Sequence, residues 1–313
     1  MTRTPCLGLL ALFFVCGCSS GDTKPTPDTR EQTPELDWVG TFLVDLLAEE
    51  PALGSSARTN VQGHVYDREP PPTGVLLQHQ SSSGSCELWV PAHPFCEPAC
   101  GIDAVCTHDG ECTPHATPLN AGTVQVTGLA PADFEIDPLS PRFPYQLPAA
   151  VHPSYPPCEE GAAVRVIASS FSLEARCVAP LVATGAAPIL VESGKPLSLA
   201  WTAPADPAAS RIAVHIDLAH HGGKKGEINC DAPDTGAFDV PEPLITELIG
   251  LGLAGYPTVE LTRHSTSASP QAPGIVLRVA STVSRALDTG VTSCSDTEPC
   301  PGELRCEMDR TCH

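Results

Sequence analysis

The sequence predicts a mainly β protein, an antiparallel β-sandwich with small disulfide-rich modules and few short helices. Short apolar runs recur about every 10 to 15 residues between turn signals, without intervening helices. The 34 prolines and 25 glycines, against only two methionines, favour many turns over long helices. Cysteines concentrate in two segments that are each too short to build a hydrophobic core.

The N-terminal segment 1–17 has the pattern of a signal peptide. A basic start with Arg3 precedes the apolar run 6–15, which is much shorter than the about 20 residues that cross a bilayer. The following Val15-Cys16-Gly17-Cys18 resembles a bacterial lipobox. That resemblance implies cleavage before Cys18 and lipidation of Cys18, so that the lipid anchors the chain to a membrane. Ser19, in place of an aspartate, indicates the outer membrane, on its periplasmic side or at the cell surface.

Residues 18–34 are polar and rich in proline and threonine, which predicts a lipidated flexible tether. The region 35–95 is expected to hold a helix and several strands. Within it, Leu36, Val39, Leu43 and Leu46 recur at helical spacing, so we expect a short amphipathic helix over 36–50. A second helix is expected over 241–253, where proline stands at the start and glycine near the end.

Ten further segments have the composition of strands. One of them, 211–218, alternates cleanly, with Ile212, Val214 and Ile216 on one face and His215 and Asp217 on the other. That alternation predicts a half-buried antiparallel strand. The expected strands are 60–66, 74–80, 86–90, 122–127, 163–169, 189–192, 197–201, 211–218, 258–263 and 275–280.

Cysteine number supports both the anchor and an oxidised fold. Of the 15 cysteines, Cys6 and Cys16 leave with the signal peptide and Cys18 carries lipid, so twelve remain. An even number is what a complete set of disulfides needs, and export to an oxidising compartment lets them persist. We therefore expect six disulfides among Cys86, Cys96, Cys100, Cys106, Cys112, Cys158, Cys177, Cys230, Cys294, Cys300, Cys306 and Cys312.

Eight of these cysteines form two four-cysteine modules, 96–112 and 294–312, with a shared spacing in their second halves. Each module allows three pairings, which sequence does not distinguish. Among the remaining four, Cys158 and Cys177 flank a predicted strand and its return, so they are the first expected pair. Zinc is the alternative ligand for the modules, but paired C-x2-C knuckles are absent.

The modules resemble the Cys-rich repeats of uncharacterised extracellular lipoproteins of myxobacteria and their relatives. Residues 118–281 are similar to a wider pattern in the same lipoproteins, including Asn229-Cys230-Asp231. In addition, Leu199-Ala200-Trp201-Thr202 resembles a strand pair of an immunoglobulin-like or fibronectin-like sandwich, with Trp201 in the core. These resemblances imply a β-sandwich-like domain and a surface location, and they carry no known activity.

The net charge and the absence of catalytic motifs argue against several classes of function. The formal net charge of −20 argues against nucleic acid and against anionic membrane surfaces as partners. Gly250-x-Gly252-x-x-Gly255 matches a dinucleotide-binding pattern, but it follows a helix, so we interpret it as a helix end. The sequence contains no H-E-x-x-H or P-loop motif, and its Gly17-Cys18-Ser19-Ser20-Gly21 match to G-x-S-x-G spans the lipobox cysteine and not a strand-to-helix turn. No catalytic residue and no cofactor is therefore expected.

One histidine-rich stretch is a candidate for a metal site. His215 and Asp217 share a predicted strand face, and His220 and His221 follow in a turn next to two lysines. An exposed hairpin tip is the commoner interpretation of this pattern. The acidic residues of the first module, Asp103, Asp109 and Glu111, lack calcium-loop spacing and are interpreted as solvated.

Three functional hypotheses follow. The first is a non-enzymatic cell-envelope lipoprotein that acts as a structural or interaction module for protein or glycan. The second is a metal- or small-ligand-binding protein of the periplasm or surface. The third is a hydrolase whose site forms only in three dimensions. The anchor, the tether, the sandwich pattern and the cysteine modules favour the first.

Overall fold

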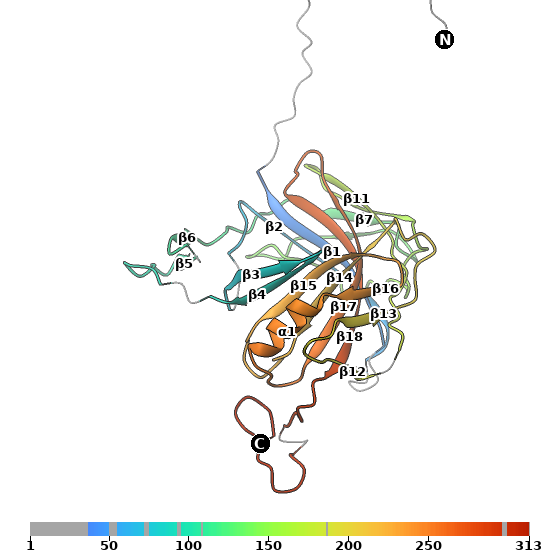
Figure 1. The fold of residues 1–313 in the computed structure, drawn as a ribbon. Helices are drawn as coiled ribbons and strands as arrows, with labels where there is room; N and C mark the ends of the chain where they lie inside the picture. The colour runs from blue at the N-terminus through green and yellow to red at the C-terminus, as the bar shows by residue number, and fades with distance from the viewer. Residues whose placement is uncertain are drawn as a thin grey trace, which may run out of the picture. The chain divides into compact units, whose positions relative to one another are not determined.

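The computed structural model describes residues 37–49, 55–71, 75–92, 95–107, 109–185, 187–295 and 299–312. They belong to the unit Pro34–His313, whereas the predicted signal peptide and tether lie outside the described residues. The described residues form eighteen strands and one helix, which confirms a mainly β fold (Figure 1). No helix among them is long and apolar enough to cross a membrane.

A ten-stranded sheet is the framework of this fold. Its centre is β17 (Thr258–Ala268), β18 (Ile275–Asp288) and β1 (Val39–Leu47), and neighbouring strands are antiparallel except where β1 and β12 pair with β18. From edge to edge its strands are β3 (Leu77–Ser83), β4 (Cys86–Pro91), β15 (Glu227–Pro233), β14 (Arg211–Asp217), β17, β18, β1, β2 (Arg58–Tyr66) and β9 (Tyr145–Gln146), with β12 (Ile189–Leu190) beside β18.

One face of this sheet is covered by two separate layers, and we call it the covered face. A four-stranded sheet packs on β1 and β18 around a core that includes Phe42, Leu173 and Leu277, which makes this half a β-sandwich. The helix α1 (Glu242–Gly250) lies against β3, β4 and β15, and two further strands complete this layer around a core that includes Trp201 and Ile216. The covering strands are β11 (Ser172–Arg176), β10 (Ala163–Ile167), β7 (Val124–Thr127) and β8 (Phe134–Ile136) in the first layer, and β13 (Leu197–Ala200) and β16 (Ala237–Val240) in the second.

A buried ion pair lies on the covered face, where the strand β17 passes from one core to the other. Arg263 is 1% exposed, and its Nε donates to Asp234 Oδ2 over 2.6 Å. Asp234 also accepts from Trp201 Nε1 and Ser210 Oγ, and Arg263 Nη2 donates to the Thr202 carbonyl. Burial alone raises the pKa of Asp234, but the hydrogen bonds from Arg263, Ser210 and Trp201 lower it overall. Trp201 is therefore a core residue, as its sequence context predicted.

The helix expected over 36–50 is wrong, because this segment contains the strand β1. Phe42, Val44 and Leu46 alternate and are fully buried on the covered face, while β2 and β18 pair with the two edges of the strand. A short apolar run fits both periods, and strand partners on both sides decide between them. The second expected helix is confirmed as α1, whose Leu244 and Leu248 are buried.

Each of the ten expected strands overlaps an observed strand, with shifted ends. The sequence interpretation missed β8, β9, β11, β15 and β16, which are short or carry polar residues on their outer face. It also missed the small hairpin of β5 (Ala104–Cys106) and β6 (Cys112–Pro114) inside the first module.

All twelve expected cysteines are paired in six disulfides. The pair Cys158–Cys177 is confirmed, and Cys86–Cys230 joins directly opposed residues of β4 and β15. Both modules connect their first cysteine to the third and their second to the fourth, namely Cys96–Cys106, Cys100–Cys112, Cys294–Cys306 and Cys300–Cys312.

The modules also share a turn, which together with their shared cysteine spacing indicates two copies of one unit. Gly110 N donates to the Thr107 carbonyl, and Arg310 N donates to the Glu307 carbonyl at the equivalent position. Gly110 and Arg310 both have positive φ, of 75° and 64°. The second module is also bonded to the β domain, because Gly255 N donates to the Asp309 carbonyl over 2.6 Å.

Candidate functional site

The second face of the ten-stranded sheet, which we call the open face, carries mostly polar side chains. Directly opposed residues of neighbouring strands point to the same face of the sheet, so the strand register determines which residues lie on the open face. The described residues of the four-stranded sheet, of β13 and β16, and of α1 all pack on the covered face instead. Central members of the open face are Asp45, Arg278, Ala280, Thr282, Thr262, His264, Thr266, Arg211, Asp231 and His215.

Charged groups gather at the centre of the open face. Asp45 is opposite Ala280, Ala280 is opposite His264, and His264 is opposite Arg211. Arg211 Nε donates to both carboxylate oxygens of Asp231 over 2.8 Å. Arg278, one register step away, has no ion pair within the described part of the chain.

Two atoms of this group are buried without a hydrogen-bond partner among the described residues, Asp45 Oδ1 and Arg278 Nε. Burial raises the pKa of Asp45, against the opposing influence of Arg278 and Arg58. Burial likewise lowers the pKa of Arg278, although Asp45 and Asp231 oppose it. The two opposite charges are near enough to influence each other, but they make no direct ion pair.

His264 is held in its neutral form at this position. Burial, followed by the positive charge of Arg278, lowers the pKa of His264 to about 4. Its Nδ1 lies 3.4 Å from Thr266 Oγ1, a long contact between two side chains of the same strand. A neutral imidazole can accept as well as donate a hydrogen bond at neutral pH.

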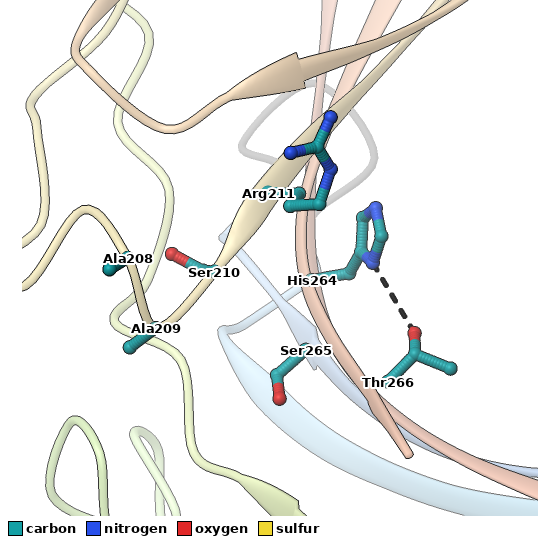
Figure 2. Close-up of a pocket in the computed structure, with 7 residues that line it drawn as sticks. All are labelled: Ala208, Ala209, Ser210, Arg211, His264, Ser265 and Thr266. Atoms are coloured by element: carbon teal, nitrogen blue, oxygen red, sulfur yellow. Dashed lines mark hydrogen bonds between the residues drawn. The ribbon is translucent and has the colours of Figure 1, made fainter. Parts of the chain in front are cut away.

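Beside His264 the surface forms a hollow of about 240 Å³, lined by Ala208, Ala209, Ser210, Arg211, His264, Ser265 and Thr266. Figure 2 shows Arg211, His264 and Thr266 on one side of the strands and Ser210 and Ser265 on the other. A second hollow of about 410 Å³ shares Ala208, Ala209, Ser265 and Thr266 with it and extends to Glu174, Arg176, Asp206 and Ser267. The two hollows therefore form one groove along β17.

The side chains of the histidine-rich stretch do not converge as the ligands of a metal ion would. Asp217 is 6% exposed and accepts hydrogen bonds from Ala219 N over 2.8 Å and from Lys224 Nζ over 3.2 Å. His215 Nδ1 bonds Asn229 Oδ1 over 2.8 Å. His220 and His221 are exposed, with ring centroids 3.9 Å apart. Asp217 is thus engaged by a lysine, and not by the histidines.

Lys224 completes this network through a close contact with Glu227. Burial, the largest influence on Lys224, lowers its pKa, but Glu227 and Asp217 together raise it. The carboxylates that a metal would use at this end of β14 are therefore neutralised by the protein's own ammonium group. Among the described residues, the groups of three or more possible metal ligands consist of cysteines alone.

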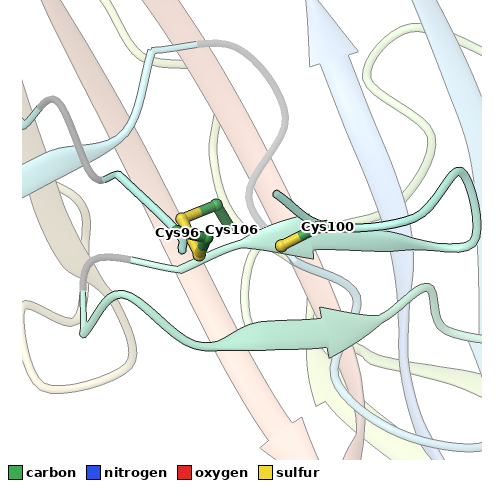
Figure 3. A group of neighbouring side chains, drawn as sticks. All are labelled: Cys96, Cys100 and Cys106. Carbon is green, nitrogen blue, oxygen red and sulfur yellow. A yellow bond between two sulfur atoms is a disulfide. The ribbon is translucent and has the colours of Figure 1, made fainter. Parts of the chain in front are cut away.

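Those cysteine groups belong to the modules. Figure 3 shows Cys96 bonded to Cys106, with Cys100 beside them. Cys100 is bonded to Cys112, and Cys294, Cys300 and Cys306 are likewise disulfide-bonded. A disulfide sulfur is not the thiolate that zinc requires, so the zinc alternative does not fit the oxidised chain. The acidic residues Asp103, Asp109 and Glu111 are exposed around the same hairpin.

The glycine pattern lies at the end of α1, as its position after a helix predicted. Gly250 is the last helical residue, and Gly252 follows with a φ of 111°. Gly255 has a φ of 55°, and its backbone bonds the second module. These glycines shape a turn and a docking contact, and they lie at the C-terminal end of a helix where phosphate is not favoured.

Cys18 lies outside the described residues, so the structure does not place the predicted lipidation site. No model of a known protein family matches the chain, and no curated protein matches it. Sequence reasoning did not identify the charged centre of the open face or the groove along β17. Both depend on strands that are far apart in the sequence.

Proposed function

We propose that this chain is a non-enzymatic lipoprotein of the cell envelope, anchored through Cys18, which binds a protein or glycan partner through its β domain. The anchor and the outer membrane as its location rest on the lipobox resemblance. The role as an interaction module rests on the polar open face and on the groove beside it. No cofactor is part of this proposal.

The observation that carries the proposal is the complete pairing of the cysteines. Every cysteine after Cys18 is bonded in one of six disulfides. Such a set persists in an oxidising compartment and is rare in a reducing one. Cys18 is then the one odd cysteine of the mature chain, which fits a residue that carries lipid.

The open face supports the interaction role. It presents arginine, carboxylate, imidazole and hydroxyl groups from five neighbouring strands, and β-sheet strands hold them in fixed relative positions. Arg278, without an ion pair among the described residues, supplies donors for a polar partner. Protein and glycan surfaces both offer matching acceptors.

The anchor is tested by labelling cells with a palmitate analogue and by separating membrane from soluble fractions. The wild-type chain is expected to carry the label and to sediment with membranes, whereas Cys18→Ser should lose the label and become soluble. Cys16→Ser is the matched control, because serine is also small at that lipobox position. A Cys18→Ser chain that keeps its label would contradict the anchor.

The absence of enzymatic activity is tested on the mature chain with Cys18→Ser, against panels of ester, peptide and glycoside substrates. We expect no turnover above buffer, and reproducible hydrolysis would overturn this part of the proposal. Binding to purified envelope glycans and outer-membrane proteins is measured in parallel. Arg278→Ala should weaken it, whereas Lys195→Ala, at an exposed lysine outside the open face, should leave it unchanged.

A further inference from the structure

The strand β17 is longer than the strand beside it, and the difference leaves part of its edge without a neighbour. β14 pairs with β17 from Asp217 opposite Thr258 to Arg211 opposite His264. β17 continues through Ser265–Ala268, which pairs only with β18. No other described strand pairs with these four residues on the side of β14. The groove described above runs along this free edge.

The backbone of the free edge presents unpaired hydrogen-bonding groups to the groove. Ser269 N donates to the Ile275 carbonyl and Leu287 N to the Pro257 carbonyl, so odd-numbered residues of β17 bond with β18. The even-numbered residues therefore direct their backbone groups towards β14. Thr266 and Ala268 lie beyond the end of β14, and among the described residues no partner bonds their backbone N–H and C=O groups. We call this segment with its groove the β17 slot.

The walls of the β17 slot are fixed by other parts of the chain. On one side, Pro207 lies in a turn in which Ala209 N donates to the Asp206 carbonyl, and Glu160 accepts from the backbone of Ala205 and Asp206. On the other side, β11 approaches so closely that Arg176 N donates to Ser265 Oγ over 3.2 Å. The chain is thus turned away from the position that an extension of β14 would occupy.

We propose that the β17 slot binds an extended peptide segment of a partner protein, which pairs with Ser265–Ala268 as an additional strand. This inference rests on the proposed interaction role and names the class of partner. The alternating donors and acceptors of Thr266 and Ala268 match the backbone of an extended peptide. A strand advances about 3.4 Å per residue, so four residues of free edge pair with a segment of about four residues.

The form of the slot favours a flexible peptide over other occupants. A glycan has no regular repeat of amide groups to match the edge. The edge strand of a folded sheet would bring its own neighbouring strands against the walls at Ala208 and Arg176, whereas a single peptide segment brings none. The lining residues Ala208, Ala209, Ser265 and Ser267 are small, and the charged residues Glu174, Arg176, Asp206 and Arg211 include both signs. We therefore expect a segment with short, uncharged side chains and without proline at its pairing positions.

The test begins with a phage-displayed library of random hexapeptides, selected on the mature chain carrying Cys18→Ser. Selected peptides are synthesised, and their dissociation constants are measured by fluorescence anisotropy. Ala208→Trp fills the slot and is expected to weaken binding at least tenfold. Ala286→Trp is the matched control, because Ala286 is also exposed but lies opposite Thr258, at the other end of β17.

Two further variants test the backbone pairing itself. Thr266→Pro removes an N–H that faces the slot and bonds nothing within the described chain, so it should spare folding and weaken binding at least tenfold. N-methylation of a selected peptide should abolish binding at every second position and leave binding unchanged at the positions between them, because only alternate residues face β17.

The proposal is overturned if no peptide is selected, or if selected peptides bind wild type, Ala208→Trp and Thr266→Pro equally. It is also overturned if N-methylation acts equally at adjacent positions. Such failures would leave the anchor and the binding of envelope fractions by the open face untouched, since those are read by palmitate labelling and by the Arg278→Ala variant. Conversely, loss of the lipid label would not alter peptide binding to the unlipidated chain.

Discussion

Arg263 and Arg278 lie on neighbouring strands of one sheet but on opposite faces, and their guanidinium groups differ in how many hydrogen-bond partners they have. Arg263, on the covered face, bonds Asp234 through two nitrogens and the Thr202 carbonyl through a third contact. Arg278, on the open face, has a buried Nε without a described partner and a lowered pKa. A charge that is fully buried needs a complete set of partners, whereas a half-buried one can leave its outer nitrogens for solvent or a ligand.

The strongest way to break this comparison is to remove the partner of Arg263. Asp234→Ala leaves a buried guanidinium uncompensated, so we expect a loss of about 3–5 kcal/mol in the free energy of unfolding. Asp231→Ala, which breaks the exposed pair with Arg211, should lose only about 0–1 kcal/mol. Urea unfolding at pH 7 measures both. A similar loss for the two variants would show that burial does not separate these ion pairs.

Removal of both charges on the covered face sharpens the same comparison. The double variant Arg263→Met with Asp234→Asn no longer buries an unpaired charge, and the amide oxygen introduced in place of the carboxylate can still accept from Ser210 or Trp201. We therefore expect it to recover about 2 kcal/mol relative to the less stable single variant. If the effects of the single variants add in the double variant, the two side chains are not energetically coupled.

His264 predicts how the open face responds to acid. Its pKa is about 4 in the folded protein and about 6.5 when unfolded, so the unfolded state binds more protons between these values. Stability should therefore fall as the pH drops from 7 to 4, by about 1–2 kcal/mol after allowance for partial solvent screening. His264→Gln should remove this part of the pH dependence. An unchanged slope in urea titrations from pH 7 to 4 would contradict the assignment.

Substitution of Asp45 has the smallest expected effect on the free energy of unfolding, and it should raise stability where the Asp234 and Asp231 variants lower it. Because burial raises its pKa, the charged form is disfavoured in the folded state at neutral pH. Asp45→Asn should therefore raise stability at pH 7 by up to about 1 kcal/mol, and this gain should shrink as acid protonates Asp45 in the wild type. A clear loss of stability in Asp45→Asn at pH 7 would indicate instead that the carboxylate stabilises Arg278.

Local signals made the fold class, the helix α1 and the cysteine set predictable. Alternation marks β14, turn residues bound the short strands, and an even cysteine count requires pairs. The buried Arg263 also has a local sequence signal, because Val259, Leu261 and Arg263 occupy alternate positions of one strand. An arginine that continues a buried series needs a carboxylate from elsewhere in the chain.

Other features had no local signal. Asp45 lies near Arg278 only because β1 and β18 pair in register, and the sequence of neither segment indicates that the two strands pair. The alternation of β1 is incomplete, because Leu43 and Leu47 lie on the open face while Phe42, Val44 and Leu46 lie on the covered face, so the apolar run also fits a helix. The β17 slot depends on the difference in length between β14 and β17, which becomes visible only after the strands are aligned.

The parallel pairing of β1 with β18 also has a consequence for the order of assembly. The first described strand and the last one lie side by side, and Ser281 Oγ donates to the Leu46 carbonyl across 235 positions of sequence. Contacts over such separations close large loops and form late. Synthesis must therefore reach the C-terminal strand before the middle of the sheet can form. In a chain exported as we propose, the centre of the sheet can therefore form only after β18 has also crossed the membrane.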